Sequence, residues 1–79
     1  MAWIAYIATR KLKSSVLGTL NPGEVVTQPT AQTAQGKEFE TPEYNDYYGY
    51  ISVVSYKSKE HAEELVKQAY KYWLSALNN

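Results

Sequence analysis

The 79-residue sequence contains no cysteine, a single histidine and only four glycines. The absence of cysteine excludes disulfides, thiolate metal ligands and cysteine nucleophiles. One histidine, His61, cannot form a histidine cluster for a metal, and the scattered glycines form no phosphate-binding loop. His61 is predicted to be an exposed helix residue with no nucleophile positioned beside it. We therefore expect a non-enzymatic protein without a metal or cofactor.

The sequence also has no net charge, because eight basic and eight acidic residues cancel. It therefore offers no overall field that would attract nucleic acid or an anionic membrane. No apolar run approaches the ~20 residues that span a bilayer. The apolar segment at the start precedes the basic residues, which reverses the order of an export signal. We expect a cytoplasmic protein with no membrane partner.

The length predicts one domain, residues 1–79, near the small end of what folds alone. A chain of this size buries only about 60% of its unfolded surface. Since disulfides and metals are excluded, oligomerisation or docking onto a larger partner is the remaining way for so small a domain to gain stability.

The first half of the chain predicts short strands. Residues 2–9 are rich in Trp, Ile and Tyr and are apolar on both faces, which indicates a strand. Residues 16–20 form a weaker strand candidate, and Asn-Pro-Gly at 21–23 is a good turn. Residues 25–26 are expected to return as a short strand and to close a hairpin around that turn. Residues 27–36 contain no large apolar side chain and predict a flexible loop.

The second half predicts a strand at 47–56 and a helix at 58–77. Ser58 is a natural N-cap, and acidic residues follow it near the positive end of the helix dipole. One apolar stripe recurs at helical spacing: Ala62, Leu65, Val66, Ala69, Trp73, Ala76 and Leu77. The expected fold is α+β, a small and mainly antiparallel sheet of three to four strands with the long C-terminal helix on one face. Trp3, Leu65, Ala69 and Trp73 are assigned to the core.

Alternation along the strands predicts a surplus of large side chains on the side away from the helix. In the 47–56 strand the odd positions, with Ile51 and Val53, suit the helix. The opposite side then carries Ile4, Tyr6, Tyr48, Tyr50, Val54 and Tyr56. We interpret this aromatic face as a surface that binds a protein partner or a second copy, since tyrosine gives contact area at low entropic cost. The alternative is that residues 16–46 fold over it within the monomer.

Charge is unevenly distributed along the chain. The basic group is Arg10, Lys11 and Lys13, and the acidic run is Glu38, Glu40, Glu43 and Asp46. Solvated turns explain both groups. The more specific hypothesis is that the basic group and the acidic run are complementary docking surfaces, between two copies of the chain or between the chain and a partner.

Single-stranded nucleic acid is the alternative partner. Tyr6, Tyr48 and Tyr50 are the candidates for stacking with bases, and nearby basic side chains are candidates for phosphate contacts. The strand tyrosines are interleaved with Ser and Val rather than with Arg or Lys. This pattern and the zero net charge disfavour nucleic acid.

Residues 5–19, AYIATRKLKSSVLGT, resemble the first residues of small proteins encoded in phage structural-gene clusters, often tail-associated. These proteins tend to begin with a strand of the YIA type, then a basic residue or two, then a turn before Gly-Thr. The resemblance contains no catalytic or ligand motif. It implies a partner in a viral particle or another phage-encoded complex, and a location in the host cytoplasm or the virion.

Overall fold

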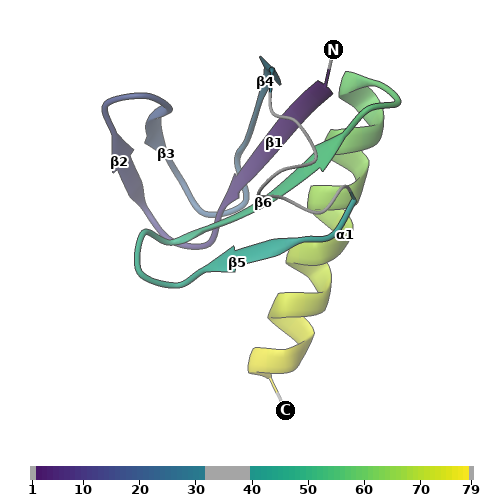
Figure 1. The fold of residues 1–79 in the computed structure, drawn as a ribbon. Coiled ribbons are helices and arrows are strands. Elements are labelled where there is room, and N and C mark those ends of the chain that lie inside the picture. Colours follow the sequence, from purple (N-terminus) through teal and green to yellow (C-terminus); the bar gives the residue numbers. More distant parts are fainter. Residues whose placement is uncertain (1, 32–39, 79) are drawn as a thin grey trace.

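The computed structural model describes residues 2–31 and 40–78. Within this part of the chain, four antiparallel strands form one sheet in the order β4-β1-β6-β5, and β2 and β3 pair separately. One helix, α1, lies across the sheet (Figure 1). The elements are β1 (Ala2–Ala8), β2 (Leu12–Ser14), β3 (Gly18–Leu20), β4 (Val25–Thr30), β5 (Glu43–Asn45), β6 (Tyr50–Ser55) and α1 (Lys59–Leu77). The fold is α+β, as the sequence predicts.

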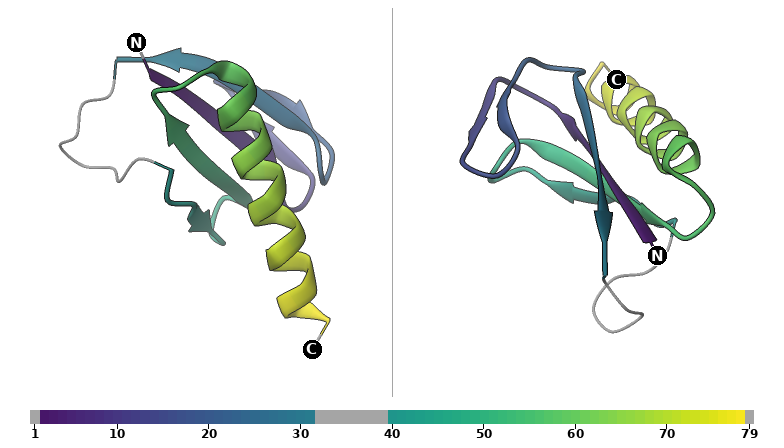
Figure 2. Two further views of the ribbon diagram at one scale, coloured as in Figure 1. Left: turned by 90° about the vertical axis from the view of Figure 1, so that its right-hand side faces the viewer. Right: turned by 90° about the horizontal axis from the view of Figure 1, so that it is seen from above.

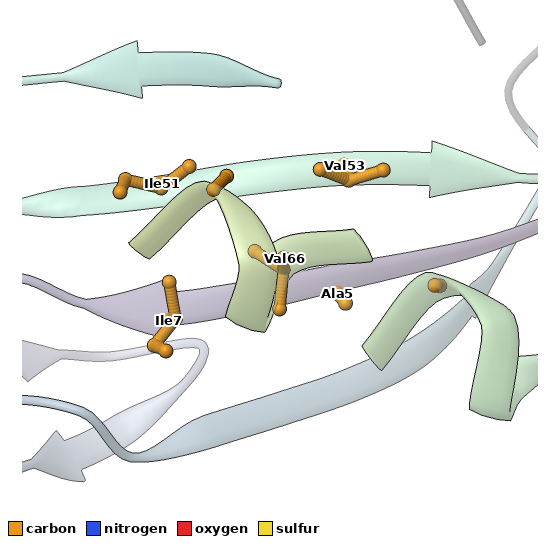
Figure 3. Close-up of a cluster of buried hydrophobic side chains, with 7 residues drawn as sticks. Ala5, Ile7, Ile51, Val53 and Val66 are labelled. Carbon is orange, nitrogen blue, oxygen red and sulfur yellow. The ribbon is translucent and has the colours of Figure 1, made fainter. Parts of the chain in front are cut away.

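The core lies between α1 and one face of the sheet. The strands contribute alternate residues from β1 and β6, and α1 contributes side chains three or four apart, as both periodicities require. Figure 3 shows this cluster, which comprises Ala5, Ile7, Ile51, Val53, Ala62, Val66 and Ala69. Trp3, Leu65 and Trp73 pack against it and are half-buried. The predicted helix-facing pair, Ile51 and Val53, is confirmed.

The start of α1 is fixed by the side chain predicted to cap it. Ser58 has an extended backbone, and its Oγ accepts a hydrogen bond of 3.0 Å from the His61 amide. This bond satisfies one of the amides that the first helical turn leaves without an intrahelical partner. The helix then runs for 19 residues.

The hairpin expected around Asn-Pro-Gly is wrong, although the turn itself is present. The Glu24 amide donates to the Asn21 carbonyl at 3.0 Å, and the Asn21 amide donates to Glu24 Oε1 at 2.7 Å. The strands on either side do not pair with each other: β3 pairs with β2, and β4 pairs with β1. The turn therefore leads from the small hairpin to the edge of the main sheet.

A serine side chain supports the turn of the β2–β3 hairpin. Ser14 Oγ accepts hydrogen bonds from the Val16 and Leu17 amides at 3.1 and 3.0 Å. Gly18 follows with a φ of +82°, which a glycine adopts without strain. A side-chain oxygen and a glycine thus close the turn.

The predicted loop at 27–36 begins too early. Strand β4 extends to Thr30, and its register places Thr27 opposite Ala5 and Pro29 opposite Trp3. The edge of β1 offers main-chain partners whatever the side chains of the added strand are, so a polar segment can join the sheet. Residues 32–36 lie outside the described residues.

The main predicted strand is shorter than expected, and α1 extends past it. Strand β6 covers only six residues, because Tyr47 and Tyr48 belong to a turn. At ~3.3 Å per strand residue and ~1.5 Å per helix residue, the strand is about 20 Å long and the helix about 28 Å. Figure 2 shows the C-terminal end of α1 projecting beyond the strands. The last buried residue of the helix is Ala69.

Candidate functional site: a tyrosine cluster

Four tyrosine rings form a continuous series on the back face, the side of the sheet opposite α1. Tyr6 of β1 and Tyr50 of β6 meet edge to face, with ring centroids 5.4 Å apart. Tyr48 stacks on Tyr50 at 6.4 Å, and Tyr47 meets Tyr48 edge to face at 4.8 Å. We call these four residues the tyrosine cluster. The offset and edge-to-face arrangements are the ones that aromatic pairs prefer.

A hydrogen-bonded turn between β5 and β6 presents the outer two rings. Asn45 Oδ1 accepts from the Tyr48 amide at 2.9 Å, and the Asn45 carbonyl accepts from the Gly49 amide at 2.9 Å. The guanidinium of Arg10 donates to the Tyr47 carbonyl. The turn is therefore tied both to its own first residue and to the segment that follows β1.

Gly49 completes this turn in a backbone conformation that other residues rarely adopt. Its φ is +87°, and the Thr9 amide donates to its carbonyl at 2.9 Å. A Cβ at this position would lie 2.8 Å from Cγ and Nε of Arg10. Both the backbone conformation and the contact with Arg10 thus require glycine.

Exposure divides the tyrosine cluster into an outer and an inner pair. Tyr47 is 81% exposed and Tyr48 is 58% exposed, whereas Tyr6 and Tyr50 are half-buried. Tyr50 packs against the leucines of the β2–β3 hairpin, and its hydroxyl accepts from Asn45 Nδ2 at 3.4 Å. The inner rings support the outer pair, and the outer pair offers its surface to solvent.

Burial also raises the pKa of the Tyr6 phenol above its ordinary value of 10.0. Tyr50 and then Glu43 add to this effect electrostatically, since a phenolate at Tyr6 would be repelled by their negative charge. The surroundings of Tyr6 therefore favour its neutral phenol.

The six predicted interface residues do not form one open patch. Ile4 and Val54 lie on the back face as expected, but they are buried with Ala2 in a small second cluster, against which the half-buried Tyr6 packs. They are not available to a partner, and this part of the prediction is corrected. Tyr56 is half exposed and follows β6, so it lies at the opposite end of the strand from Tyr48.

The back face is also partly covered by the chain itself. The β2–β3 hairpin packs Leu12 and Leu20 against Ala8, with Val26 and Tyr50 beside them. This covering was the alternative left open by the sequence, and it applies to the part of the face next to the hairpin. What remains exposed of the tyrosine cluster is chiefly Tyr47 and Tyr48.

The charged residues fall into separate places. Arg10, Lys11 and Lys13 are exposed after β1 and in β2, and Glu43 and Asp46 are exposed in and after β5. Glu40 lies near the start of α1, with its Oε2 3.4 Å from His61 Nε2 and 4.0 Å from Lys57 Nζ. Glu38 lies outside the described residues. Arg10 and Glu40 therefore have contacts within the chain, which supports a structural role for each.

His61 is less exposed than the sequence reading predicted. Its side chain is half-buried, and its Nε2 has no hydrogen-bond partner among the described residues although Glu40 is near. The helix turn that Ser58 caps directs His61 toward the segment before β5.

Sequence reasoning missed Tyr47, because strict alternation placed it on the helix side. The available signal was Asn45 followed by Asp46 and then Gly49, a combination that favours a turn. A turn there ends the alternation and frees both Tyr47 and Tyr48 from the strand. The contact between Arg10 and Tyr47 could not be predicted from the sequence, since 37 residues separate them.

Comparisons with protein-family models, curated proteins and solved structures find no match. Within residues 2–31 and 40–78, no three His, Asp or Glu side chains gather in a way that could hold a metal ion. No helix in that same part of the chain is long and apolar enough to cross a membrane.

Proposed function

We propose that this chain is a non-enzymatic protein-binding module that uses Tyr47 and Tyr48 to contact a protein partner. The observation that carries the proposal is a pair of touching, largely exposed rings on a turn held by hydrogen bonds. Rings held in place before binding lose little side-chain entropy on binding, and their hydroxyls tolerate water at the rim. Tyrosine is among the residues that contribute most to protein interfaces.

A protein partner is favoured over single-stranded nucleic acid by the surroundings of the rings. The Arg10 guanidinium already donates to the Tyr47 carbonyl, and the exposed carboxylate of Asp46 adjoins Tyr47 in the sequence. One face of Tyr48 is occupied by Tyr50, so successive bases cannot stack on both. Nucleic-acid modules instead combine open rings with a positive groove.

The resemblance of residues 5–19 to small phage structural proteins supports a more specific setting. In this proposal the partner belongs to a viral particle or another phage-encoded complex, in the host cytoplasm or the virion. The chain would act there as a subunit, an inhibitor or a connecting protein without chemistry of its own.

The test compares two variants that each remove exposed tyrosine. Tyr47→Ser/Tyr48→Ser removes the outer pair, and the control Tyr72→Ser removes a 73% exposed ring on α1. A binding partner should first be isolated by affinity capture on the unmodified chain, from a lysate of the cells that produce this protein. The purified partner should then be titrated by calorimetry against the unmodified chain, the double variant and the control. We expect the double variant to bind at least about tenfold more weakly, roughly 1.4 kcal/mol, and the control to bind normally.

Circular dichroism should show both variants folded, because the replaced side chains are exposed. Equal binding by all three chains would overturn the proposal. A labelled oligothymidine, followed by fluorescence anisotropy at several salt concentrations, tests the alternative. Tight and strongly salt-dependent binding that needs Tyr47 and Tyr48 would favour nucleic acid instead.

A further inference from the structure

The exposed part of the tyrosine cluster offers a restricted set of contacts to a partner. The aliphatic side chains of the back face, Ile4 and Val54, are buried, whereas Tyr47 and Tyr48 are largely exposed. Each phenol combines a flat apolar ring with one O–H donor. A ligand that fits this surface therefore brings apolar groups together with hydrogen-bond acceptors.

Two common forms of bound peptide find little support at this site. An added strand needs a continuous run of main-chain groups at a sheet edge. The border strand beside the turn, β5, has only three residues, and the Val54 carbonyl of β6 already accepts a hydrogen bond of 2.7 Å from the Glu40 amide. A bound helix needs an apolar groove, and the aliphatic residues of this face are buried.

Two exposed carboxylates accompany the tyrosine cluster, one at each end of the series of rings. Glu43 of β5 lies on the back face and acts electrostatically on the Tyr6 phenol. Asp46 precedes Tyr47 in the turn. The Arg10 guanidinium is held on the Tyr47 carbonyl. Charge complementarity at this site therefore favours a ligand that carries lysine or arginine.

We propose that the tyrosine cluster binds a proline-rich segment of its protein partner, in the polyproline II conformation and flanked by lysine or arginine. This inference rests on the proposed function and specifies the form of the partner. Proline has no amide hydrogen, and a polyproline II helix makes no internal hydrogen bonds, so its carbonyls can accept from the phenol O–H groups. Proline rings packing on aromatic side chains is a recurring mode of peptide recognition.

Both surfaces are ordered before they meet. The turn that carries Tyr47 and Tyr48 is held by Asn45 and by the backbone at Gly49, and proline fixes the backbone of the ligand. Binding therefore costs little conformational entropy. Because two exposed rings make a small contact, we expect a dissociation constant of about 0.1–1 mM for an isolated segment.

The experiment is an NMR titration of the whole chain with synthetic peptides, up to about 2 mM. The first peptide has about ten residues, with proline at every third position, alanine between and arginine at both ends, so that either chain direction can bind. It should shift the amide signals of Tyr47, Tyr48 and Gly49. Replacing its prolines with alanine should weaken binding at least about tenfold, because the ligand is no longer ordered beforehand. Replacing its arginines with glutamate should weaken binding at least about threefold.

Variants of the chain separate the ring from the hydroxyl. Tyr47→Ser/Tyr48→Ser should abolish binding of the proline peptide, and the control Tyr72→Ser should bind it normally. Tyr47→Phe/Tyr48→Phe keeps both rings and removes both donors, so it should bind about fivefold more weakly. Full binding by the phenylalanine variant would refute the role of the hydroxyls as donors to the ligand carbonyls.

Three other outcomes would overturn the inference. They are equal binding of the proline and alanine peptides, binding that survives Tyr47→Ser/Tyr48→Ser, and no shift of the three amide signals at the highest concentration. If the peptide fails while the captured partner still needs Tyr47 and Tyr48, the proposed function stands and the partner presents a different form. If the captured partner binds all variants equally, the proposed function itself fails.

Discussion

Gly49 is the position at which one added carbon should disturb the turn of the tyrosine cluster most. Its φ of +87° would strain an alanine by about 1–2 kcal/mol. The new Cβ would also lie 2.8 Å from Cγ and Nε of Arg10, so the arginine must move. Moving it removes the hydrogen bond to the Tyr47 carbonyl, worth about 1 kcal/mol at an exposed site. We expect Gly49→Ala to lower the free energy of unfolding by about 2–3 kcal/mol.

Gly18→Ala is the matched control, because Gly18 has nearly the same φ without the contact. Its φ is +82°, and a Cβ there would meet no atom within 4 Å. This variant should cost only the backbone strain, about 1–2 kcal/mol. Urea unfolding measures both, and an unchanged m-value would show that the same surface is exposed on unfolding. In an Arg10→Ala background the extra cost of Gly49→Ala should shrink, since the obstructing side chain is gone.

The outcome that refutes this reasoning is equally definite. If Gly49→Ala and Gly18→Ala destabilise the protein equally within about 0.5 kcal/mol, the contact with Arg10 has no energetic role. A coupling between positions 10 and 49 near zero would lead to the same conclusion. The rings of Tyr47 and Tyr48 would then be held by Asn45 and the backbone alone.

Two further predictions concern the core and the inner ring of the tyrosine cluster. Val66→Ala should lower the free energy of unfolding by about 2–3 kcal/mol, because two methyl groups leave a cavity in a fully buried site. Lys67→Ala, at the exposed neighbouring position, should change it by less than about 0.5 kcal/mol in the same urea titration, and similar losses for both would contradict the placement of the core. For Tyr6, the raised pKa means that the unfolded chain loses the phenol proton at lower pH than the folded chain. The associated stability is therefore complete below about pH 10 and is lost as pH rises through the folded pKa. Urea unfolding from about pH 8 to pH 11 should show a steeper decline for the unmodified chain than for Tyr6→Phe, and parallel declines would refute the assignment.

The parts of the fold that the sequence predicted are those where one physical signal dominates. Ser58, followed by an apolar stripe of period 3.6, defined α1, and alternation placed Ile51 and Val53 beneath it. The pairing of strands was harder to predict, because main-chain hydrogen bonds leave little trace in side-chain identity. Strand β4 therefore extends into a polar segment, and the two strands that the turn at 21–23 connects do not pair with each other.

Only part of the tyrosine cluster was predicted from the sequence, because alternation along a strand assigns a face but does not report tertiary packing. Alternation correctly grouped Tyr6, Tyr50, Ile4 and Val54 on one face of the sheet. It could not show that Ile4 and Val54 become buried, since burial depends on the packing of segments distant in sequence. Nor could it place Tyr47, because a residue with positive φ at Gly49 interrupts the period of two.

Pro29 in β4 limits how copies of this chain can aggregate. Bonds such as the one from the Ala8 amide to the Glu24 carbonyl show that the even-numbered residues of β4 point their main-chain groups toward β1. The nitrogen of Pro29 therefore lies on the outer side, where an incoming strand would need an amide hydrogen that proline lacks. At the other border of the sheet, β5 has only three residues. Both borders of the sheet thus resist edge-to-edge pairing with the strands of another copy.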